Sequence, residues 1–290
     1  MDKLLQWAIV NQATESEDAP SQSKPVQMEK LDPGIIDAIL GKDDATRMKE
    51  CMTAIKDENT PLEAKEIAFD DLEMLIEGID NAMNLENMRL WKPLIEVLDS
   101  PHPSLRMNAA WVCGTAIQNN PKAQKAFMDN NGLQPILRVL RDDEDVAARS
   151  KALYCVSGLI KHFPPGFQAF TAEGGFKILK NILNKDNDVS LISKTIFLLN
   201  ALVQQEYITP AHLQKSGLIE DVISRLDKDQ DNEIIAEKGL FLILTLSSSA
   251  DSLSADQKAA LKPVILSLQK KHPEALSKED WKQVVDAVTN

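Results

Sequence analysis

Apolar residues recur every three to four positions through most of the chain after residue 30, and this spacing predicts amphipathic helices. The pattern predicts helices over 31–40 and 44–56. A third is expected to begin at Pro61, because proline is favoured in the first turn of a helix, and to end near Asp80.

Two short polar breaks punctuate the middle of the chain. Asn119-Asn120-Pro121 follows one long apolar helix, and Asn131-Gly132 follows a shorter helix ten residues later. Asparagine and glycine tolerate the left-handed backbone that ends helices, and proline cannot continue one. These breaks predict a long helix, a short helix and a new helix in succession.

The same arrangement returns at a nearly constant interval. Residues 91–98 match 133–140 at an offset of 42, and Gly132 recurs as Gly175 and Gly217. The long helices align at offsets of 42, 43 and 44 through residues 110–113, 152–155, 195–198 and 239–242. On this alignment Trp111 and Phe197 fall on apolar helix faces, and we expect both in the core.

A period of 42 to 44 residues is typical of armadillo and HEAT proteins, and the break inside each unit favours the three-helix armadillo unit. The prediction is an all-α, armadillo-like right-handed α-solenoid over residues 31–290. About four repeats occupy residues 90–255, between a cap over 44–87 and a closing cap over 254–290.

The first 30 residues have a different character. Residues 12–30 are polar and should be flexible, because they cannot bury enough apolar surface to offset the entropy of ordering. Ahead of them stands an apolar cluster of Leu4, Leu5, Trp7 and Ile9. The residues alone allow two interpretations, a helix that folds back on the body or a hydrophobic segment presented to a partner.

Composition narrows the possible partners and the compartment. Charged residues make up 26% of the chain and the net charge is −12, with no Lys/Arg run longer than Lys270-Lys271, so nucleic acid is not an expected partner. No apolar run is long enough to span a membrane, and the N-terminus lacks a secretory signal. We therefore expect a cytoplasmic protein without a membrane partner.

No set of residues suggests catalysis. The three cysteines are far apart without a Cys-x-x-Cys pair, and the four histidines have no second ligand at metal-binding spacing. We expect no metal, no cofactor, no catalytic residue and no enzyme activity. A solenoid without such residues is expected to bind a partner.

One candidate class is the armadillo adaptor that binds extended peptides, as importins do. Those proteins repeat a Trp followed one helical turn later by an Asn. In the alignment above, the corresponding pairs are Trp111 and Thr115, Leu153 and Ser157, Ile196 and Asn200, and Leu240 and Leu244. The repeated Trp/Asn pair is missing, which weakens this alternative.

Several motifs together resemble a different family. The motifs cover residues 4–9, 68–77, 79–82, 85–87, 114–120 and 129–133. In order and spacing they are similar to the fungal cytosolic nucleotide exchange factors of the 70-kDa heat-shock chaperones, which are related to the animal heat-shock-binding protein. The resemblance extends over nearly the whole chain and is weakest in residues 12–30 and after residue 250.

The resemblance implies a partner, a mechanism and a set of contact residues. It implies a monomer whose concave face grips the chaperone's ATPase domain and promotes ADP release, while Leu4, Leu5, Trp7 and Ile9 help to release clients. The chaperone-binding residues that it implies are Asp80, Asn81, Ala82, Gln118, Asn119, Asn120 and Lys194. From the residues alone, the asparagines could equally be helix caps.

Overall fold

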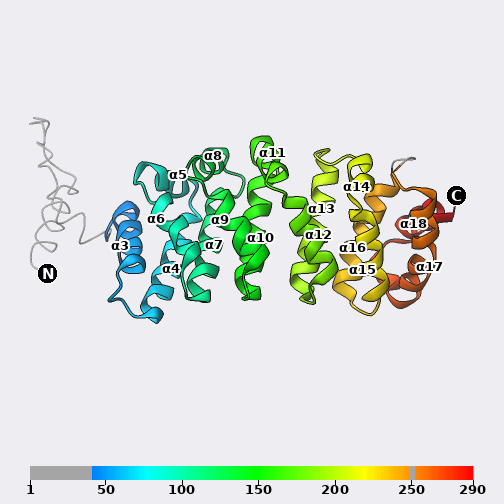
Figure 1. Ribbon diagram of the computed structural model, residues 1–290, viewed down its shortest axis with the longest axis horizontal. Coiled ribbons are helices and arrows are strands. Elements are labelled where there is room, and N and C mark those ends of the chain that lie inside the picture. The colour runs from blue at the N-terminus through cyan, green and yellow to red at the C-terminus, as the bar shows by residue number, and fades with distance from the viewer. Residues whose placement is uncertain (1–40, 249–251, 290) are drawn as a thin grey trace, which may run out of the picture. The chain divides into compact units, whose positions relative to one another are not determined.

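The computed structural model describes residues 41–248 and 252–289, and within them every regular element is a helix (Figure 1). The all-α prediction is confirmed. Two compact units divide the chain, Met1–Arg47 and Met48–Asn290. The predicted flexible segment, with Leu4, Leu5, Trp7 and Ile9, and the predicted helix over 31–40 lie outside the described residues.

The second unit repeats one arrangement of three helices. Five long helices are α4 (Leu62–Ile76), α7 (Pro103–Ile117), α10 (Val146–Ile160), α13 (Val189–Gln204) and α16 (Glu233–Ser247). Each of the first four precedes a short helix: α5 (Ile79–Asn87), α8 (Pro121–Asp129), α11 (Pro164–Ala172) and α14 (Pro210–Ser216). The third members are α6 (Trp91–Glu96) with η1 (Val97–Asp99), α9 (Leu133–Asp142), α12 (Gly175–Lys185) and α15 (Leu218–Lys228).

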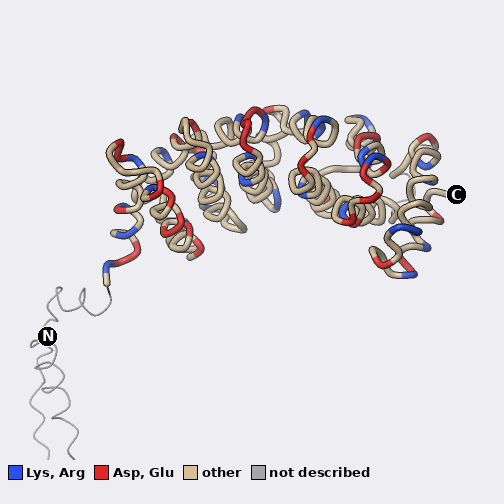
Figure 2. The backbone as a smooth tube through the Cα atoms, turned by 90° about the horizontal axis from the view of Figure 1, so that it is seen from below, with Lys and Arg blue, Asp and Glu red and all other residues tan. Residues whose placement is uncertain are grey.

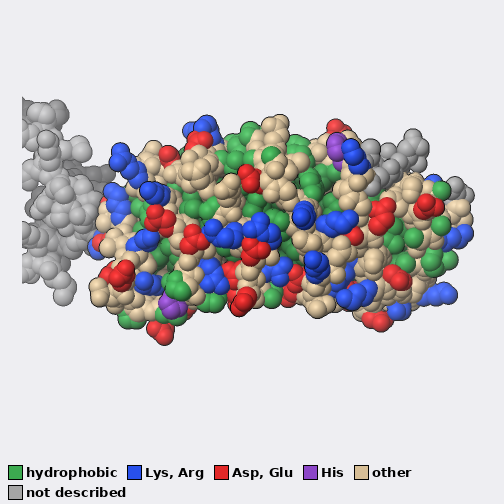
Figure 3. Space-filling view, viewed as in Figure 1, with side chains coloured by type: hydrophobic (Ala, Val, Ile, Leu, Met, Phe, Trp, Pro, Cys, Tyr) green, Lys and Arg blue, Asp and Glu red, His purple; other side chains and the backbone are tan. Residues whose placement is uncertain are grey.

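Three further helices complete the series at its two ends. They are α3 (Asp44–Lys56), α17 (Ala255–Lys271) and α18 (Lys278–Thr289), with the short η2 (Pro273–Ala275) before α18. Within the second unit the helices follow an arc, and the long helices lie on its inner side (Figure 2). Figure 3 shows the other side, formed largely by α9, α12 and α15, where acidic and basic side chains are interspersed.

The predicted breaks are confirmed, with a backbone reason for each. Asn119 and Asn131 have φ values of 50° and 60°, and they reverse the chain after α7 and after α8. Asn120 then caps α8, because its side-chain Oδ1 accepts a hydrogen bond from the Ala123 amide at 3.2 Å. The asparagines at these breaks therefore end one helix and start the next.

The recurring glycines have a packing role that the sequence did not reveal. A Cβ on Gly132 would lie 2.3 Å from the ring of Phe127, and one on Gly175 would lie 2.1 Å from the ring of Phe170. Both phenylalanines are fully buried. Glycine is therefore required because an aromatic ring from the preceding short helix packs directly against the backbone where the next helix starts.

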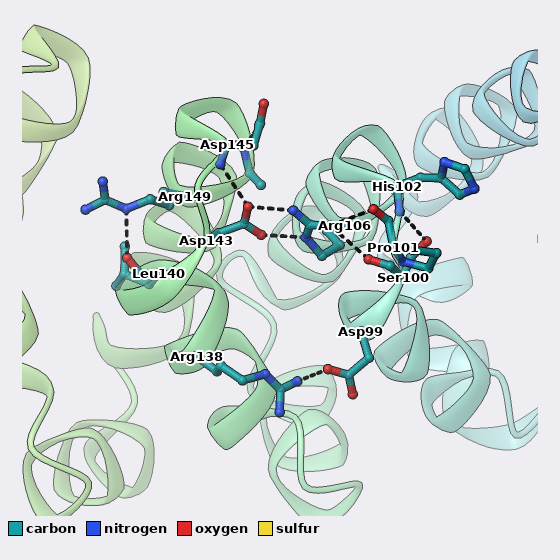
Figure 4. Close-up of polar contacts among 11 residues, drawn as sticks. Asp99, Ser100, Pro101, His102, Arg106, Arg138, Leu140, Asp143, Asp145 and Arg149 are labelled. Carbon is teal, nitrogen blue, oxygen red and sulfur yellow. Dashed lines mark hydrogen bonds and ion pairs between the residues drawn. The ribbon is translucent and has the colours of Figure 1, made fainter.

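Ion pairs near the starts of the long helices tie these helices to the segments that follow the third helices, and Figure 4 shows one of them. The Arg106 guanidinium donates two hydrogen bonds, of 2.6 and 2.7 Å, to the carboxylate of Asp143, and a third to the carbonyl of Ser100. Arg149 contacts Asp186 through a single hydrogen bond, while its Nε donates to the Leu140 carbonyl. The bidentate Arg106 pair fixes both distance and orientation, so it sets how α7 sits against the end of α9.

Replacement of Arg106 by alanine should destabilise the second unit by about 3 kcal/mol, because it leaves the nearly buried Asp143 carboxylate without its partner. The hydrogen bonds from Arg106 lower the pKa of Asp143 below its ordinary value. The contribution is therefore present above the ordinary aspartate pKa and is lost as the pH falls through the lowered one. Urea unfolding at several pH values measures it.

The control is Arg138→Ala, which removes an ion pair with Asp99 that is about half exposed on both sides. Surface pairs contribute about 1 kcal/mol or less, so this change should be small and depend little on pH. Equal losses in the two variants would contradict a special role for the Arg106 contact.

Candidate functional site

The caps of the long helices determine which residues reach the inner side. The N-cap residues are His102, Asp145, Asp188 and Asn232, so successive long helices are 43, 43 and 44 residues apart. The prediction that α10 follows α7 at an offset of 42 was one residue short. Apolar residues occupy both registers, and hydrophobic matching alone could not separate them.

The corrected register aligns four aromatic residues, Trp111, Tyr154, Phe197 and Phe241, on successive long helices. We call this set the aromatic ladder. Phe197 is 51% exposed, so its predicted place in the core is wrong, and Trp111 is only half-buried. The one-residue error between α7 and α10 had matched Trp111 with the buried Leu153, whereas Tyr154, Phe197 and Phe241 were already aligned with one another.

The positions four residues beyond the ladder carry no asparagine: they are Thr115, Gly158, Ala201 and Thr245. Thr115 donates a 2.8 Å hydrogen bond to Glu73, and the backbone of Gly158 lies against the Gln118 side chain. The inner side thus carries repeated aromatic residues, as peptide-binding armadillo proteins do, but lacks the asparagine that accompanies each of them in those proteins.

The inner side is hollowed where α7, α10 and α13 meet. This hollow, which we call the inner groove, has a volume of about 500 Å³. Its lining combines three ladder aromatics with three lysines and polar side chains: Trp111, Gln118, Lys151, Leu153, Tyr154, Ser157, Lys161, Lys194 and Phe197. Accessible aromatic side chains gathered in a hollow are typical of interaction surfaces.

The three lysines are placed by different contacts. Lys151 lies over the Trp111 ring, with Nζ 3.5 Å from the ring centroid, a cation–π contact. Lys194 donates a 2.6 Å hydrogen bond to the Ser150 hydroxyl, and Lys161 follows the last turn of α10, where the helix dipole favours a cation. Partial burial lowers the pKa of both Lys151 and Lys161.

The predicted contact residues at the start of α5 are Asp80, Asn81 and Ala82, and they differ in how far they are exposed to solvent. The preceding helix was expected to end near Asp80 but ends at Ile76, because the backbone is extended at Gly78. Asp80 is exposed, and Asn81 donates a 2.9 Å hydrogen bond to the Leu75 carbonyl at the end of α4. Ala82 in α5 is 2% exposed and belongs to the core, so its side chain is not accessible to a partner.

The second predicted cluster, at the end of α7, is similarly divided. Gln118 lines the inner groove, Asn119 is exposed beside it, and Asn120 is buried as the cap of α8. Lys194 lines the same groove from α13. The structure therefore brings Gln118 and Lys194 together across α10, whereas Asp80 lies on a different element. The alignment error separated Trp111 from Tyr154, and the sequence analysis also missed Lys151 and Lys161.

Other chemistry is sparse in the part of the chain that the structure describes. No group of three His, Cys, Asp or Glu side chains there could hold a metal ion. The cysteines are buried, and burial raises the pKa of the Cys113 and Cys155 thiols, which disfavours the reactive thiolate. None of the described helices is long and apolar enough to cross a membrane.

The stacked three-helix units and the inner groove define an armadillo-type solenoid. A designed armadillo repeat protein in complex with the peptide (KR)4 matches 83% of this chain and 99% of its own, with a TM-score of 0.63 at 14% identity. A chain from a structure titled "A conserved phosphorylation switch controls the interaction between cadherin and beta-catenin in vitro and in vivo" matches over 88% of the present chain and 56% of its own length, with a TM-score of 0.58 at 13% identity. These likenesses concern the fold alone.

Sequence comparison identifies the family. Residues 1–85 match the family described as "Nucleotide exchange factor Fes1", and residues 81–230 match the "SIL1/FES1/HPBP1 C-terminal domain". The chain belongs to the SIL1/FES1/HPBP1 family.

Two relatives are named as Hsp70 nucleotide exchange factors. The fes1 protein of Schizosaccharomyces pombe is 42% identical over 157 residues, which is 54% of this chain and 53% of the relative. FES1 of Saccharomyces cerevisiae is 40% identical over 163 residues, or 54% of each chain. The chain thus spans about half the length of these curated relatives.

Replacement of Ala82 by arginine should destabilise the fold by about 3 kcal/mol or more, because no space exists for a long charged side chain at this buried position. The matched substitution Asp80→Arg, two residues away on the exposed side of α5, should leave the melting temperature nearly unchanged. Thermal unfolding followed by circular dichroism measures both. An unchanged melt for Ala82→Arg would refute this assignment.

Proposed function

We propose that this chain is a nucleotide exchange factor that binds the ATPase domain of a cytosolic 70-kDa heat-shock chaperone and promotes release of ADP. The observation that carries the proposal is the family match over residues 1–230, within which the relatives are named as Hsp70 nucleotide exchange factors. The activity needs no catalytic group, in keeping with a solenoid whose main hollow is lined by aromatic, lysine and amide side chains.

The inner groove is the surface that best suits the chaperone. Gln118 and Lys194 line it, and Asn119 is exposed at its edge. In this proposal these residues touch the partner, and Asp80 extends the contact along the inner side. Asn81, Ala82 and Asn120 act indirectly, because their contacts hold the ends of α4, α5 and α8 in place.

The proposed mechanism is a shift of the chaperone's conformational equilibrium. A rigid arc binds an open arrangement of the ATPase lobes more tightly than the closed arrangement that holds ADP. Thermodynamic reciprocity then requires that the bound exchange factor weaken the binding of ADP by the same factor by which bound ADP weakens the binding of the exchange factor. Coupling free energies of this type are typically about 1–3 kcal/mol. The stacked core supports this role because a packed solenoid transmits contact forces with little deformation.

Three further parts of the proposal concern the whole protein. It acts as a monomer, because one arc suffices to hold one lobe. It works in the cytoplasm, where chaperones of this class bind clients. Leu4, Leu5, Trp7 and Ile9 imitate an apolar client segment and displace clients from the chaperone, a role suggested by their chemistry and by the family match over residues 1–85.

Addition of the purified full chain to a cytosolic 70-kDa chaperone loaded with a fluorescent ADP analogue should accelerate release of the analogue at least tenfold, the scale expected from a coupling of about 1.4 kcal/mol. Stopped-flow fluorescence measures the rate. A chain thermally unfolded before mixing serves as the control. An unchanged rate of analogue release at a saturating concentration of the chain would refute the proposed function and favour a peptide-binding adaptor.

Deletion of residues 1–30 should leave ADP release unchanged and slow the release of a labelled client peptide, because the deletion removes only the apolar segment and its polar tether. Substitution of Leu4, Leu5, Trp7 and Ile9 by serine should reproduce the effect at constant length. The two rates are measured in parallel on the same chaperone. Equal loss of both would contradict a separate role for this segment.

A further inference from the structure

The centre of the inner groove carries positive charge without an ion-pair partner. Lys151, Lys161 and Lys194 line it, and none lies within ion-pair distance of a carboxylate among the residues that the structure describes. The chain as a whole has 44 acidic and 32 basic side chains, so carboxylates are abundant. Three unpaired lysines in one hollow of an acidic protein therefore call for an explanation.

Several lysines and arginines elsewhere among the described residues lie in ion pairs, and lysines that do not, such as Lys177 and Lys185, are exposed to water instead of gathered in a hollow. On the outer side and between units, Lys180 pairs with Asp221, and Arg149 pairs with Asp186. Along the inner side the nearest long helix, α4, is acidic, with Asp70, Asp71 and Glu77 exposed. Figure 2 shows red segments gathered toward the N-terminal end of the arc. The inner side is thus divided into an acidic end and a basic centre.

The lysines at the basic centre also carry a desolvation cost in the free protein. Burial of the charged side chains lowers the pKa of Lys151 and Lys161, which means that water around these ammonium groups is partly removed. The Glu73 carboxylate opposes the shift of the Lys151 pKa from beyond ion-pair distance, and Lys161 has no such counterpart among the described residues. The contact with the Trp111 ring offsets part of the cost for Lys151. A partner that brought negative charge into the groove would remove the remainder.

We infer that the groove between α10 and α13 receives a carboxylate-bearing segment of the partner protein, held by Lys151, Lys161 and Lys194 against the exposed ring of Phe197 and the half-buried ring of Tyr154. The acidic α4 repels the same segment, so the partner docks in one direction along the arc. This inference rests on the proposed function, because the segment belongs to the chaperone.

A protein surface fits better than other anions. The ladder continues beyond the groove to Phe241, and Ile234 on the same helix is 52% exposed, so apolar contacts extend past the lysines. A nucleic acid would bring phosphates along its whole length and would meet the carboxylates of α4. A segment that mixes carboxylates with apolar side chains satisfies both the basic centre and its aromatic border.

The test reverses two of the charges in the full chain. Lys151→Glu combined with Lys161→Glu should weaken binding to the purified chaperone about tenfold at 50 mM salt, mainly through a slower association rate. Because the lost attraction is electrostatic, the difference from the unaltered chain should shrink at 300 mM salt. Biolayer interferometry gives both rates, and circular dichroism checks the fold.

The matched control is Lys177→Glu with Lys185→Glu, two exposed lysines on α12 outside the groove. It changes the net charge by the same amount, so equal weakening in both pairs would show an effect of net charge and overturn the inference. If the reversed groove variant fails to fold, Lys151→Gln with Lys161→Gln replaces it, and a loss of about threefold is expected.

A carboxylate-to-lysine scan of the chaperone's ATPase domain completes the test. One of these carboxylate-to-lysine substitutions in the chaperone should restore its binding to the chain that carries Lys151→Glu and Lys161→Glu. The double-mutant cycle between the two proteins then locates the acidic segment. If the unaltered chain accelerates ADP release while the groove variant binds equally well, the inference fails and the proposed function stands. If the unaltered chain does not accelerate release, the proposed function itself fails.

Discussion

No helix in the second unit can bury its apolar side alone, and this constraint governs the rest of the structure. Each unit must pack on the next, so the core is continuous along the arc. The Arg106–Asp143 and Arg149–Asp186 pairs add directional contacts to this stacking, and the Arg106 pair is the more restrictive because its bidentate geometry forms at only one relative position.

In three of the long helices, α10, α13 and α16, the side chain of the N-cap residue fixes where the helix begins and therefore which residues face the inner side. Asp145, Asp188 and Asn232 accept hydrogen bonds from amides three residues later, so they fix where the helical turn begins. Once the start is fixed, the residue nine positions later faces the inner side. The aromatic ladder is therefore a consequence of cap positions, and a shift of one residue would turn every ladder residue into the core.

This explains what the sequence could and could not predict. The helix breaks at Asn119 and Asn131 were predictable, because their chemistry is local. The register of α7 against α10 was not, because Ala110 and Cys113 match apolar residues at either offset. The error separated Trp111 from Tyr154, and the apolar character of α13 led to the separate wrong prediction that Phe197 lies in the core. The burial of Ala82 was equally invisible, because an alanine carries no sign of which side of a short helix it occupies.

The inner groove shows a tension between stability and binding. An exposed phenylalanine and partly dehydrated lysines make the free protein less stable than a fully polar surface would, and nothing in the stacking of the units requires them. The Arg106–Asp143 ion pair near the start of α7 supplies stability at a place that no partner needs to reach. Separation of the two tasks lets the inner side carry groups that gain most when a partner covers them. The helix starts are thus specialised for holding the arc, and the inner surfaces for contact.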